Sequence, residues 1–323
     1  MKKYNWAILG TGLIGREMAL ALKEVNGEIY AVANRSIEKA KSFGKEFAVT
    51  KVYENCDKML EDPNVDIVYI STPHNAHYEY LLKAVKNNKH VLCEKAITVN
   101  SKQLEEVVNI AKEKNLVIAE AMTIFHMPLY KKLKEIVDSG AIGKIKMIQV
   151  NFGSCKEYDV NNRFFSKELA GGALLDIGVY ATSFARFFME NKPNTILTTA
   201  NYFEAGVDEQ SGIILKNDCG QMAVMALTMR AKQPKRGVVS GELGYIEVNN
   251  YPRANKATIT YTEDNRTEEI ILGDTSKALC YEVEDMQNYI TNKTGDEQLQ
   301  LTRDVTHILS EVRNHWGFIY PFE

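Results

Sequence analysis

Gly10-Thr11-Gly12-Leu13-Ile14-Gly15 is the stretch that decides the fold of the first part of the chain. It follows the apolar run Trp6–Leu9 and opens the amphipathic stretch Gly15–Val25, so the pattern predicts a strand, a tight turn and a helix. In such a turn the first glycine allows the sharp bend, the second lets the backbone approach a pyrophosphate, and the third lets the helix pack on the strand. The N–H groups at the start of the helix favour a diphosphate. The turn predicts a dinucleotide site; the alternative is a glycine-rich turn without a ligand.

From this turn to residue 121, short apolar strands alternate with amphipathic helices. This alternation predicts a Rossmann domain, in which a doubly wound parallel sheet is covered on both faces. Ser36 and Ser101 precede two of the expected helices, and we expect both to act as N-caps. The expected strands are Trp6–Leu9, Ile29–Ala33, Ile67–Ser71, His90–Cys93 and Val117–Ala119.

The pattern changes after Glu120, because strand-like segments then follow one another without helices between them. This order predicts an α/β domain with a large, mostly antiparallel sheet. The 323 residues also exceed the roughly 250–300 that one hydrophobic core supports, so we expect two domains, 1–121 and 122–323. The expected strands of the second are Ile145–Ser154, Ile196–Phe203, Ser211–Lys216, Met222–Met229, Tyr245–Val248, Ala257–Tyr261 and Glu269–Leu272.

Composition excludes several classes of partner. A net charge of −3 and a pI near 6.1 give no cationic field for nucleic acid or an anionic membrane. The chain has no apolar run long enough to span a bilayer, and the one that precedes Gly10 is too short for a signal peptide. The five cysteines are scattered and odd in number, which indicates reduced thiols. We therefore expect a soluble cytoplasmic protein.

The end of the second expected strand distinguishes NADP from NAD. An acidic residue there would accept the ribose hydroxyls of NAD, but the sequence reads Ala33-Asn34-Arg35-Ser36. Arg35 offers a planar fork of donors that suits a 2′-phosphate, and the Ser36 hydroxyl adds another donor. This pattern favours NADP, with NAD still possible; a solvated surface arginine is the alternative for Arg35.

Four blocks of the sequence carry a family resemblance: Gly10–Gly15, Ser71-Thr72-Pro73-His74-Asn75-Ala76-His77, Glu94-Lys95 and Gly171-Gly172-Ala173-Leu174-Leu175-Asp176-Ile177-Gly178-Val179-Tyr180. Together they resemble the Gfo/Idh/MocA family of NAD(P)-dependent oxidoreductases. Tyr180 and the closing Tyr320-Pro321-Phe322-Glu323 look most like its dihydrodiol dehydrogenase and D-xylose dehydrogenase branch. The resemblance implies a Rossmann domain and an open-faced α/β domain whose sheet usually forms a dimer interface, so a homodimer or a dimer of dimers is expected.

Motif and resemblance together predict the cofactor-binding residues. They are Gly10, Thr11, Gly12, Leu13, Ile14, Asn34, Arg35, Ser36, Ser71, Thr72, Pro73, His74, Asn75, His77, Glu94 and Lys95. The branch usually carries a Trp and an Arg after the fifth strand, and Thr123-Ile124-Phe125-His126 does not match them. That departure weakens any transfer of substrate specificity.

Lys95 follows an expected strand directly, and the carboxyl ends of parallel strands border the ligand crevice. We expect this lysine to face the nicotinamide, and the resemblance implies that it assists proton transfer. The family usually has proline after the lysine, where this chain has Ala96. Because a cis bond before a residue other than proline costs about 2.5–4 kcal/mol, we expect a trans bond or a slightly rebuilt loop here.

Asp176 and Tyr180 are four residues apart and so share one face of a helix. The resemblance implies that Tyr180 exchanges a proton with the substrate hydroxyl, while Asp176 orients the substrate or pairs with Lys95. A phenol needs a nearby cation to ionise near neutral pH, and Lys95 supplies one if the domains close over the cofactor. The alternatives are a core tyrosine and a carboxylate that favours the helix N-terminus.

Arg163 resembles a family position that holds substrate oxygens; a surface-loop arginine is the alternative. His74 and His77 lie three residues apart without a third ligand nearby in sequence, so no metal is expected. We expect His74 to line the nicotinamide end of the pocket and His77 to start a helix.

Two functions remain in view. The first is an NADP-dependent dehydrogenase or reductase that acts on a hydroxyl or carbonyl carbon of a sugar, polyol or small cyclic diol. The second is a catalytically silent dinucleotide-binding regulator of the same fold. The presence of Lys95, Asp176 and Tyr180 together favours the enzyme, since a silent member need not keep all three.

Overall fold

The computed structural model describes residues 3–323, and the chain divides into two compact units. The first runs through Ala121 and also includes Leu279–Thr302, whereas the second holds Met122–Ala278 and Arg303–Glu323. The prediction that 122–323 form one domain is therefore wrong for Leu279–Thr302. In this returning segment the Cys280 thiol lies 3.9 Å from the carbonyl of Ala21. Helical periodicity alone does not tell which of two sheets a late helix will cover.

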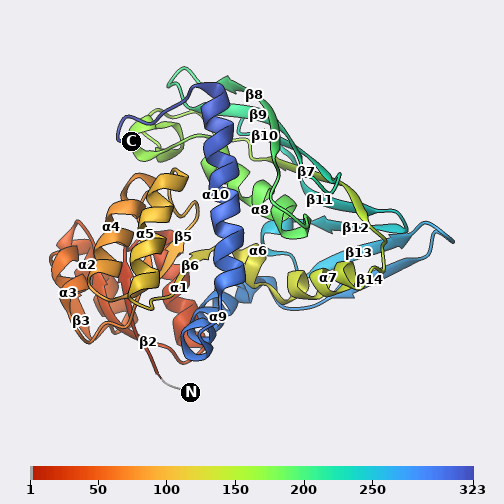
Figure 1. Ribbon diagram of the computed structural model, residues 1–323. Helices are drawn as coiled ribbons and strands as arrows, with labels where there is room; N and C mark the ends of the chain where they lie inside the picture. Colours follow the sequence, from red (N-terminus) through yellow and green to blue (C-terminus); the bar gives the residue numbers. More distant parts are fainter. Residues whose placement is uncertain (1–2) are drawn as a thin grey trace. The chain divides into compact units, whose positions relative to one another are not determined.

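The first unit contains the predicted doubly wound sheet, of which β2, β3, β5 and β6 are labelled in Figure 1. Its six parallel strands follow the order β3-β2-β1-β4-β5-β6. The edge strand β3 escaped prediction because it is three residues long and two of them are exposed, which leaves no apolar run. The strands are β1 (Asn5–Leu9), β2 (Glu28–Ala33), β3 (Lys51–Tyr53), β4 (Ile67–Ile70), β5 (His90–Glu94) and β6 (Ile118–Ala121).

Side-chain caps mark the start of three helices of the first unit, at Ser36, Asn55 and Asn100. The Ser36 hydroxyl accepts a hydrogen bond from the N–H of Lys39, which confirms the first predicted cap. The second prediction was wrong, since Asn100 rather than Ser101 accepts from the N–H of Gln103, at 2.9 Å. The helices are α1 (Leu13–Glu24), α2 (Ile37–Phe47), α3 (Cys56–Glu61), α4 (His74–Lys86), α5 (Ser101–Glu113) and α9 (Ala278–Asn292).

The second unit contains an eight-stranded sheet in the order β14-β13-β12-β11-β7-β10-β9-β8. All neighbours are antiparallel except β7 and β10, so the prediction of a mostly antiparallel sheet is confirmed. The central strand β11 escaped prediction because its first residues are polar and exposed. The strands are β7 (Ile145–Gly153), β8 (Thr195–Tyr202), β9 (Asp208–Lys216), β10 (Met222–Thr228), β11 (Gln233–Gly241), β12 (Gly244–Asn249), β13 (Lys256–Tyr261) and β14 (Thr267–Ile271).

One face of this sheet is covered by helix and the other is open. Along β7, Ile148, Val150 and Phe152 are buried while Gln149 between them is exposed, the alternation of a half-covered sheet. Helix α8 contacts β7, β10 and β11 on the buried side. The remaining helices of the unit are α6 (Thr123–His126), α7 (Pro128–Asp138) and α8 (Val179–Phe188), and α10 (Asp296–Trp316) runs from the first unit into the second.

Within residues 3–323, no helix combines the length and hydropathy needed to cross a membrane.

Candidate active site and cofactor site

The glycine turn between β1 and α1 has the geometry of a phosphate cradle. Gly10 has a φ of +110°, and a Cβ there would lie 2.8 Å from the carbonyl oxygen of Ser71. A Cβ on Gly15 would lie 2.4 Å from the carbonyl oxygen of Gly10, so helix and turn touch through backbone alone. Gly12 has open space on its Cβ side. The first and third glycines are thus needed for packing, and the second leaves its backbone accessible.

The N-terminus of α1 has no side-chain cap on its N-cap residue, Gly12, so a bound anion fits the free end of this helix. Thr11 beside it is tied to the next strand, because the Asn34 amide donates to its hydroxyl at 2.7 Å. The Asn34 carbonyl oxygen in turn accepts from the N–H of Ser36 at 2.9 Å. Arg35 between them is exposed at the carboxyl end of β2. Leu13 and Ile14, the other two predicted residues of the turn, form the exposed and half-buried first positions of α1.

The second predicted block follows β4 and meets the same turn. The Ser71 hydroxyl donates to the Gly10 carbonyl at 3.1 Å, and Pro73 is the N-cap residue of α4. Thr72 has a buried hydroxyl for which the described residues provide no hydrogen-bond partner. A buried unpaired hydroxyl is costly unless a ligand or water satisfies it, so this atom also fits a bound dinucleotide. Asn75 is half-buried in the first turn of α4.

The peptide bond between Lys95 and Ala96 is cis, so the expectation of a trans bond was wrong. Two imidazoles hold this turn from α4. His74 Nε2 lies 3.0 Å from the carbonyl oxygen of Lys95, and His77 Nδ1 lies 2.9 Å from that of Ala96. The two contacts hold the backbone on either side of the Lys95–Ala96 bond. They could not be predicted from the replacement of the family proline by Ala96.

His77 is fully buried, and its second nitrogen, Nε2, lies 2.8 Å from the carbonyl oxygen of Thr72. Burial lowers the pKa of His77 and favours the neutral ring, which has one N–H for two carbonyl oxygens. His77 therefore links the second block to the Lys95 turn, a larger role than the predicted helix start.

Glu120, at the end of β6, contacts the same turn and was not predicted. Its Oε1 accepts a hydrogen bond from the N–H of Ile97 at 3.0 Å. Burial raises the pKa of Glu120 to about 7, with Glu94 raising it further and Lys95 lowering it. Glu94 itself accepts a hydrogen bond from the Tyr69 hydroxyl. The predicted strand ended at Ala119, one residue before Glu120, and no motif marked this glutamate.

The Tyr180 segment begins with a π-helical turn, Leu174–Gly178, and continues as α8. Every residue from Gly171 to Met189 is buried except Tyr180, which is half-buried. Single π-helical turns of this kind occur often at functional sites. The alternative of a core tyrosine does not describe this residue, because it alone in the segment reaches the surface.

Asp176 in the π-helical turn lies between two cations of its own unit. Its carboxylate oxygens are 3.7 Å from Lys156 Nζ and 3.6 Å from a guanidinium nitrogen of Arg163. The Phe164 ring also contacts both cations: its centre lies 3.6 Å from Lys156 Nζ and 4.2 Å from Arg163 Cζ. Arg163 thus lies beside Asp176. Lys156 was missed, because it lies in an irregular segment without periodicity.

The start of the Tyr180 segment is fixed by polar contacts. Asp208 accepts a hydrogen bond from the N–H of Leu174 at 2.6 Å, and burial raises the pKa of Asp208 to about 7. The Tyr320 hydroxyl donates to the Gly171 carbonyl at 2.7 Å. The buried carboxylate and tyrosine therefore determine where the segment begins.

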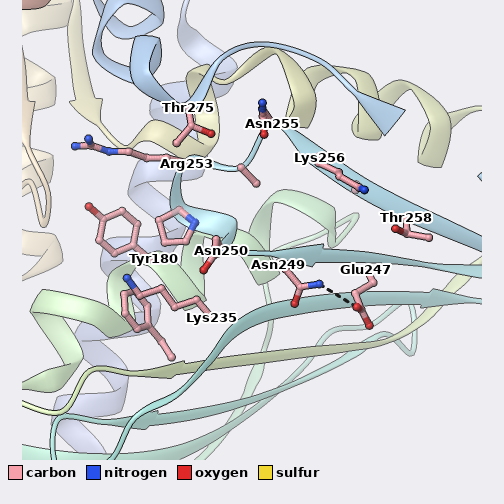
Figure 2. A pocket seen from close by; sticks show the side chains of 14 residues that line it. Tyr180, Lys235, Glu247, Asn249, Asn250, Arg253, Asn255, Lys256, Thr258 and Thr275 are labelled. Atoms are coloured by element: carbon pink, nitrogen blue, oxygen red, sulfur yellow. Dashed lines mark hydrogen bonds between the residues drawn. The ribbon is translucent and has the colours of Figure 1, made fainter. Parts of the chain in front are cut away.

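A pocket of about 670 Å³ lies within the second unit, and Tyr180 lines it (Figure 2). Its other walls come from β11, β12, β13 and the 3-10 turn Tyr251–Arg253. The charged and amide residues of this lining were not predicted, since nothing in their spacing connects them. They are Lys235, Glu247, Asn249, Asn250, Arg253, Asn255 and Lys256.

Comparison with known proteins follows the same division of the chain. Residues 4–122 match the oxidoreductase family with an NAD-binding Rossmann fold, and residues 130–247 match the GFO/IDH/MocA C-terminal domain. The chain belongs to the Gfo/Idh/MocA oxidoreductase family. This Gfo/Idh/MocA member is an NAD(P)-dependent enzyme.

Two relatives and one solved structure show how far the similarity extends. The trans-1,2-dihydrobenzene-1,2-diol dehydrogenase of Xenopus laevis is 29% identical, over 98% of this chain and 99% of its own. The scyllo-inositol 2-dehydrogenase (NADP(+)) IolU of Bacillus subtilis is 28% identical, over 98% of each. The crystal structure of KijD10, a 3-ketoreductase from Actinomadura kijaniata in complex with NADP and TDP-benzene, has the same fold. Its TM-score is 0.86 at 23% identity, over 97% of this chain and 98% of that one.

Proposed function

We propose that this protein is an NADP-dependent dehydrogenase or reductase that acts on a hydroxyl or carbonyl carbon of a sugar, a polyol or a small cyclic diol. The observation that carries the proposal is the position of Tyr180, the one residue of its buried segment that reaches a pocket. The names of the relatives support the substrate class, since one acts on a cyclic diol and another on an inositol.

The residues of the first unit fit an NADP molecule. The uncapped N-terminus of α1 and the open side of Gly12 suit a diphosphate, and the unpartnered Thr72 hydroxyl suits a further polar contact. Exposed Arg35, with the Ser36 hydroxyl next to it, suits the 2′-phosphate that distinguishes NADP. The relative IolU is named for NADP as well.

Hydride transfer is the chemistry that a nicotinamide supplies when bound. The chain's part is to move the proton of the substrate hydroxyl. In our proposal Tyr180 Oη takes this proton during oxidation and returns it during reduction. A tyrosine with its ordinary pKa is a weak base at neutral pH, so an adjacent cation is required.

We propose that Lys95 supplies this cation, by lowering the pKa of Tyr180 or by donating a hydrogen bond to the same substrate oxygen. Asp176 orients the substrate in this scheme, and its pairing with Lys156 and Arg163 keeps its carboxylate in place. The predicted pairing of Asp176 with Lys95 remains a further possibility within the proposal.

We also propose a cytoplasmic homodimer, or a dimer of dimers, formed through the open face of the eight-stranded sheet. That face has a shallow hollow of about 210 Å³ lined by Val224, Ala226, Val238 and polar neighbours. Exposed apolar side chains such as Leu197 lie on strands of the same sheet. Apolar residues at such positions suit a self-complementary interface.

A substrate screen tests the proposed reaction. Purified protein is mixed with a panel of polyols, aldoses and cyclic diols, and the absorbance of NADPH and of NADH is followed in parallel. We expect turnover of at least one compound, with NADP giving the higher kcat/KM. Binding of the dinucleotide without turnover of any compound would contradict the enzyme and favour a silent regulator.

The cofactor choice is tested with Arg35→Asp. We expect the Kd of NADPH to rise about 10- to 100-fold, the range for losing a hydrogen bond between charged groups, while the Kd of NADH changes little. Lys45→Asp, the same charge reversal at the far exposed end of α2, is the matched control. If the Kd values of NADPH and NADH rise equally, Arg35 does not bind the 2′-phosphate.

A further inference from the structure

The pocket of the second unit brings a lysine and the proposed proton-transfer residue to one cavity. Lys235 on β11 and Tyr180 on α8 both line it. In Figure 2 the amino end of Lys235 lies at the same end of the pocket as Tyr180. Lys95, the cation of the proposed mechanism, belongs to the first unit, whereas Lys235 and Tyr180 both belong to the second. The unit that carries the phenol therefore also carries a cation in the same pocket.

A buried aromatic ring holds the ammonium of Lys235 in place. Its Nζ lies 4.8 Å from the centre of the Phe152 ring, and that centre lies 6.0 Å from the centre of the Tyr180 ring. A cation over an aromatic ring is attracted by the electron-rich face of that ring. Phe152 is only 5% exposed, so the ring that Lys235 contacts has little freedom to move. The ammonium is thus one ring away from the phenol.

Strand β11, which carries Lys235, is fixed against α8. The carbonyl oxygen of Lys235 accepts a hydrogen bond from the N–H of Asn250 at 2.7 Å. Two residues further along the strand, a Cβ on Gly237 would lie 2.3 Å from a ring atom of Phe184, so strand and helix are in direct contact. Phe184 follows Tyr180 by one helical turn and shares its face of α8. The position of Lys235 relative to Tyr180 is therefore set by the packing of the unit.

The acidic groups around Tyr180 are paired with cations other than Lys235. Asp176, four residues before Tyr180, forms ion pairs with two of them. Glu247, which lines the same pocket, accepts a hydrogen bond from Arg236 Nε at 2.8 Å. The two cations beside Asp176 are Lys156 and Arg163. Neither carboxylate forms an ion pair with Lys235.

The remaining charged and titratable groups of this pocket have partners of their own or stay neutral. Arg253 lines the pocket and takes part in an interaction of its own, and Lys256 forms an ion pair with a glutamate on the adjacent strand. Tyr251 is buried, and burial raises its pKa well above the usual value, with two neighbouring phenols adding to the effect. Within residues 3–323, the ammonium of Lys235 contacts an aromatic ring and forms no ion pair.

We propose that the ammonium of Lys235 stabilises the phenolate form of Tyr180 from within the second unit, so that Lys235 is a positioning residue for proton transfer. This inference rests on the proposed function and adds a second cation to Lys95. A positive charge favours the ionised form of a neighbouring phenol, because the phenolate is negative and the phenol is not. Since Lys235 and Tyr180 belong to one unit, this stabilisation requires neither bound NADP nor the Lys95 turn.

Ultraviolet difference titration of the cofactor-free protein tests the proposal without turnover. Subtracting the titration of Tyr180→Phe from that of the wild type isolates the ionisation of Tyr180. The same subtraction is made between Lys235→Met and the double variant Lys235→Met/Tyr180→Phe. It should give a pKa for Tyr180 about 0.5–1 unit higher than in the wild type, the size expected for a partly solvated charge at such a separation. This difference should largely disappear in about 1 M salt, where the Debye length is about 3 Å.

Two further variants separate the effect of charge from that of packing. Lys235→Arg keeps the charge and should keep the pKa of Tyr180 near its wild-type value. Lys192→Met, which removes an exposed lysine outside the pocket, is the control and should also keep it. Thermal unfolding checks that all variants are folded. The proposal is overturned if Lys235→Met leaves the pKa of Tyr180 unchanged, or if Lys235→Arg raises it as much as Lys235→Met does. Failure of the proposed function is a separate result, because it appears as absence of turnover in the substrate screen and does not alter this titration.

Discussion

The turn that carries Lys95 and the segment that carries Tyr180 hold the two groups proposed to handle the proton, and they are supported in different ways. The turn is fixed by polar side chains: His74, His77 and Glu120 each contact its backbone. Burial shifts the pKa of both His77 and Glu120 toward the neutral form, so this support depends on pH and can be weakened one side chain at a time.

The Tyr180 segment is held mainly by close packing of its side chains. Its residues are buried on all sides from Gly171 to Met189, apart from Tyr180 itself, and its start requires glycines where no side chain fits. Packing of this kind does not change with pH, but it tolerates no added atom. The Asp208 contact at the start of the segment is polar and does titrate. The two proposed proton-handling groups are thus positioned in different ways, Lys95 by polar contacts and Tyr180 mainly by packing. Different substitutions should therefore disturb one position without the other.

The largest expected effect is on Tyr180 itself. Tyr180→Phe removes the proton-carrying hydroxyl while keeping the ring, so we expect kcat to fall by about 10²- to 10⁴-fold, the usual contribution of general acid–base catalysis. The Kd of NADPH should stay within about two-fold, since the dinucleotide motif lies in the other unit. Single-turnover kinetics and a dinucleotide titration measure both quantities.

Tyr245→Phe, at an exposed tyrosine of β12, is the control and should leave kcat unchanged. If Tyr180→Phe keeps near wild-type turnover, the proton is handled by Lys95 or by water, and the comparison between the two supports loses its catalytic meaning.

The second effect tests the support by volume. Gly172 has a φ of +113°, and a Cβ there would lie 2.0 Å from Oδ1 of Asp208, the residue that binds the N–H of Leu174. We expect Gly172→Ala to lower the free energy of unfolding by about 2–4 kcal/mol, from backbone strain and the displaced hydrogen bond. Because the displaced segment carries Tyr180, kcat should fall as well.

Gly220→Ala separates the two causes, since Gly220 has a φ of +77° but open space around the added Cβ. It should cost only about 1 kcal/mol, as measured by urea unfolding. If both variants lose the same free energy of unfolding, the close approach of Asp208 to Gly172 does not contribute to the stability of the segment.

The sequence predicted most strands of both sheets and the two segments that carry Lys95 and Tyr180, but it did not predict every strand. The glycine turn was predicted from its spacing and its flanking strand and helix. Lys95 and Tyr180 were assigned through the family resemblance, and the cis bond after Lys95 was not predicted. Five of the six strands of the parallel sheet and seven of the eight strands of the other sheet followed from the apolar pattern. Strand β11 was missed, because a strand that begins with exposed polar residues carries little periodicity.

The supporting residues could not be predicted, because they act across long separations in the chain. Glu120 meets Ile97 from a different strand, and Lys156 meets Asp176 from an irregular segment. Arg253 reaches the pocket on a turn whose hydrogen-bond donors lie more than a hundred residues earlier. Such contacts are set by the folded sheet order, which local patterns do not encode.

The smallest expected effect tests the polar support at Glu120. Burial raises the pKa of this carboxyl from 4.5 to about 7, so between these values the folded state binds a proton that the unfolded state has lost. The contribution of Glu120 to stability therefore falls as pH rises through this window. Glu120→Gln keeps an oxygen for the N–H of Ile97 but cannot titrate. Relative to wild type, the variant should gain on the order of 2–3 kcal/mol between pH 5 and pH 8, as measured by urea unfolding.

Asp208→Asn provides the matching change in the other unit, since burial also raises the pKa of Asp208 to about 7. Both variants should show the same sign of pH dependence in stability. They should differ in catalysis, because Glu120 supports the Lys95 turn, whereas Asp208 fixes the start of the Tyr180 segment. We expect Glu120→Gln to change how kcat/KM varies near pH 7, and Asp208→Asn to lower kcat at every pH. If both variants have the same pH profile, the turn does not depend on the charge of Glu120, and the two kinds of support cannot be told apart by titration.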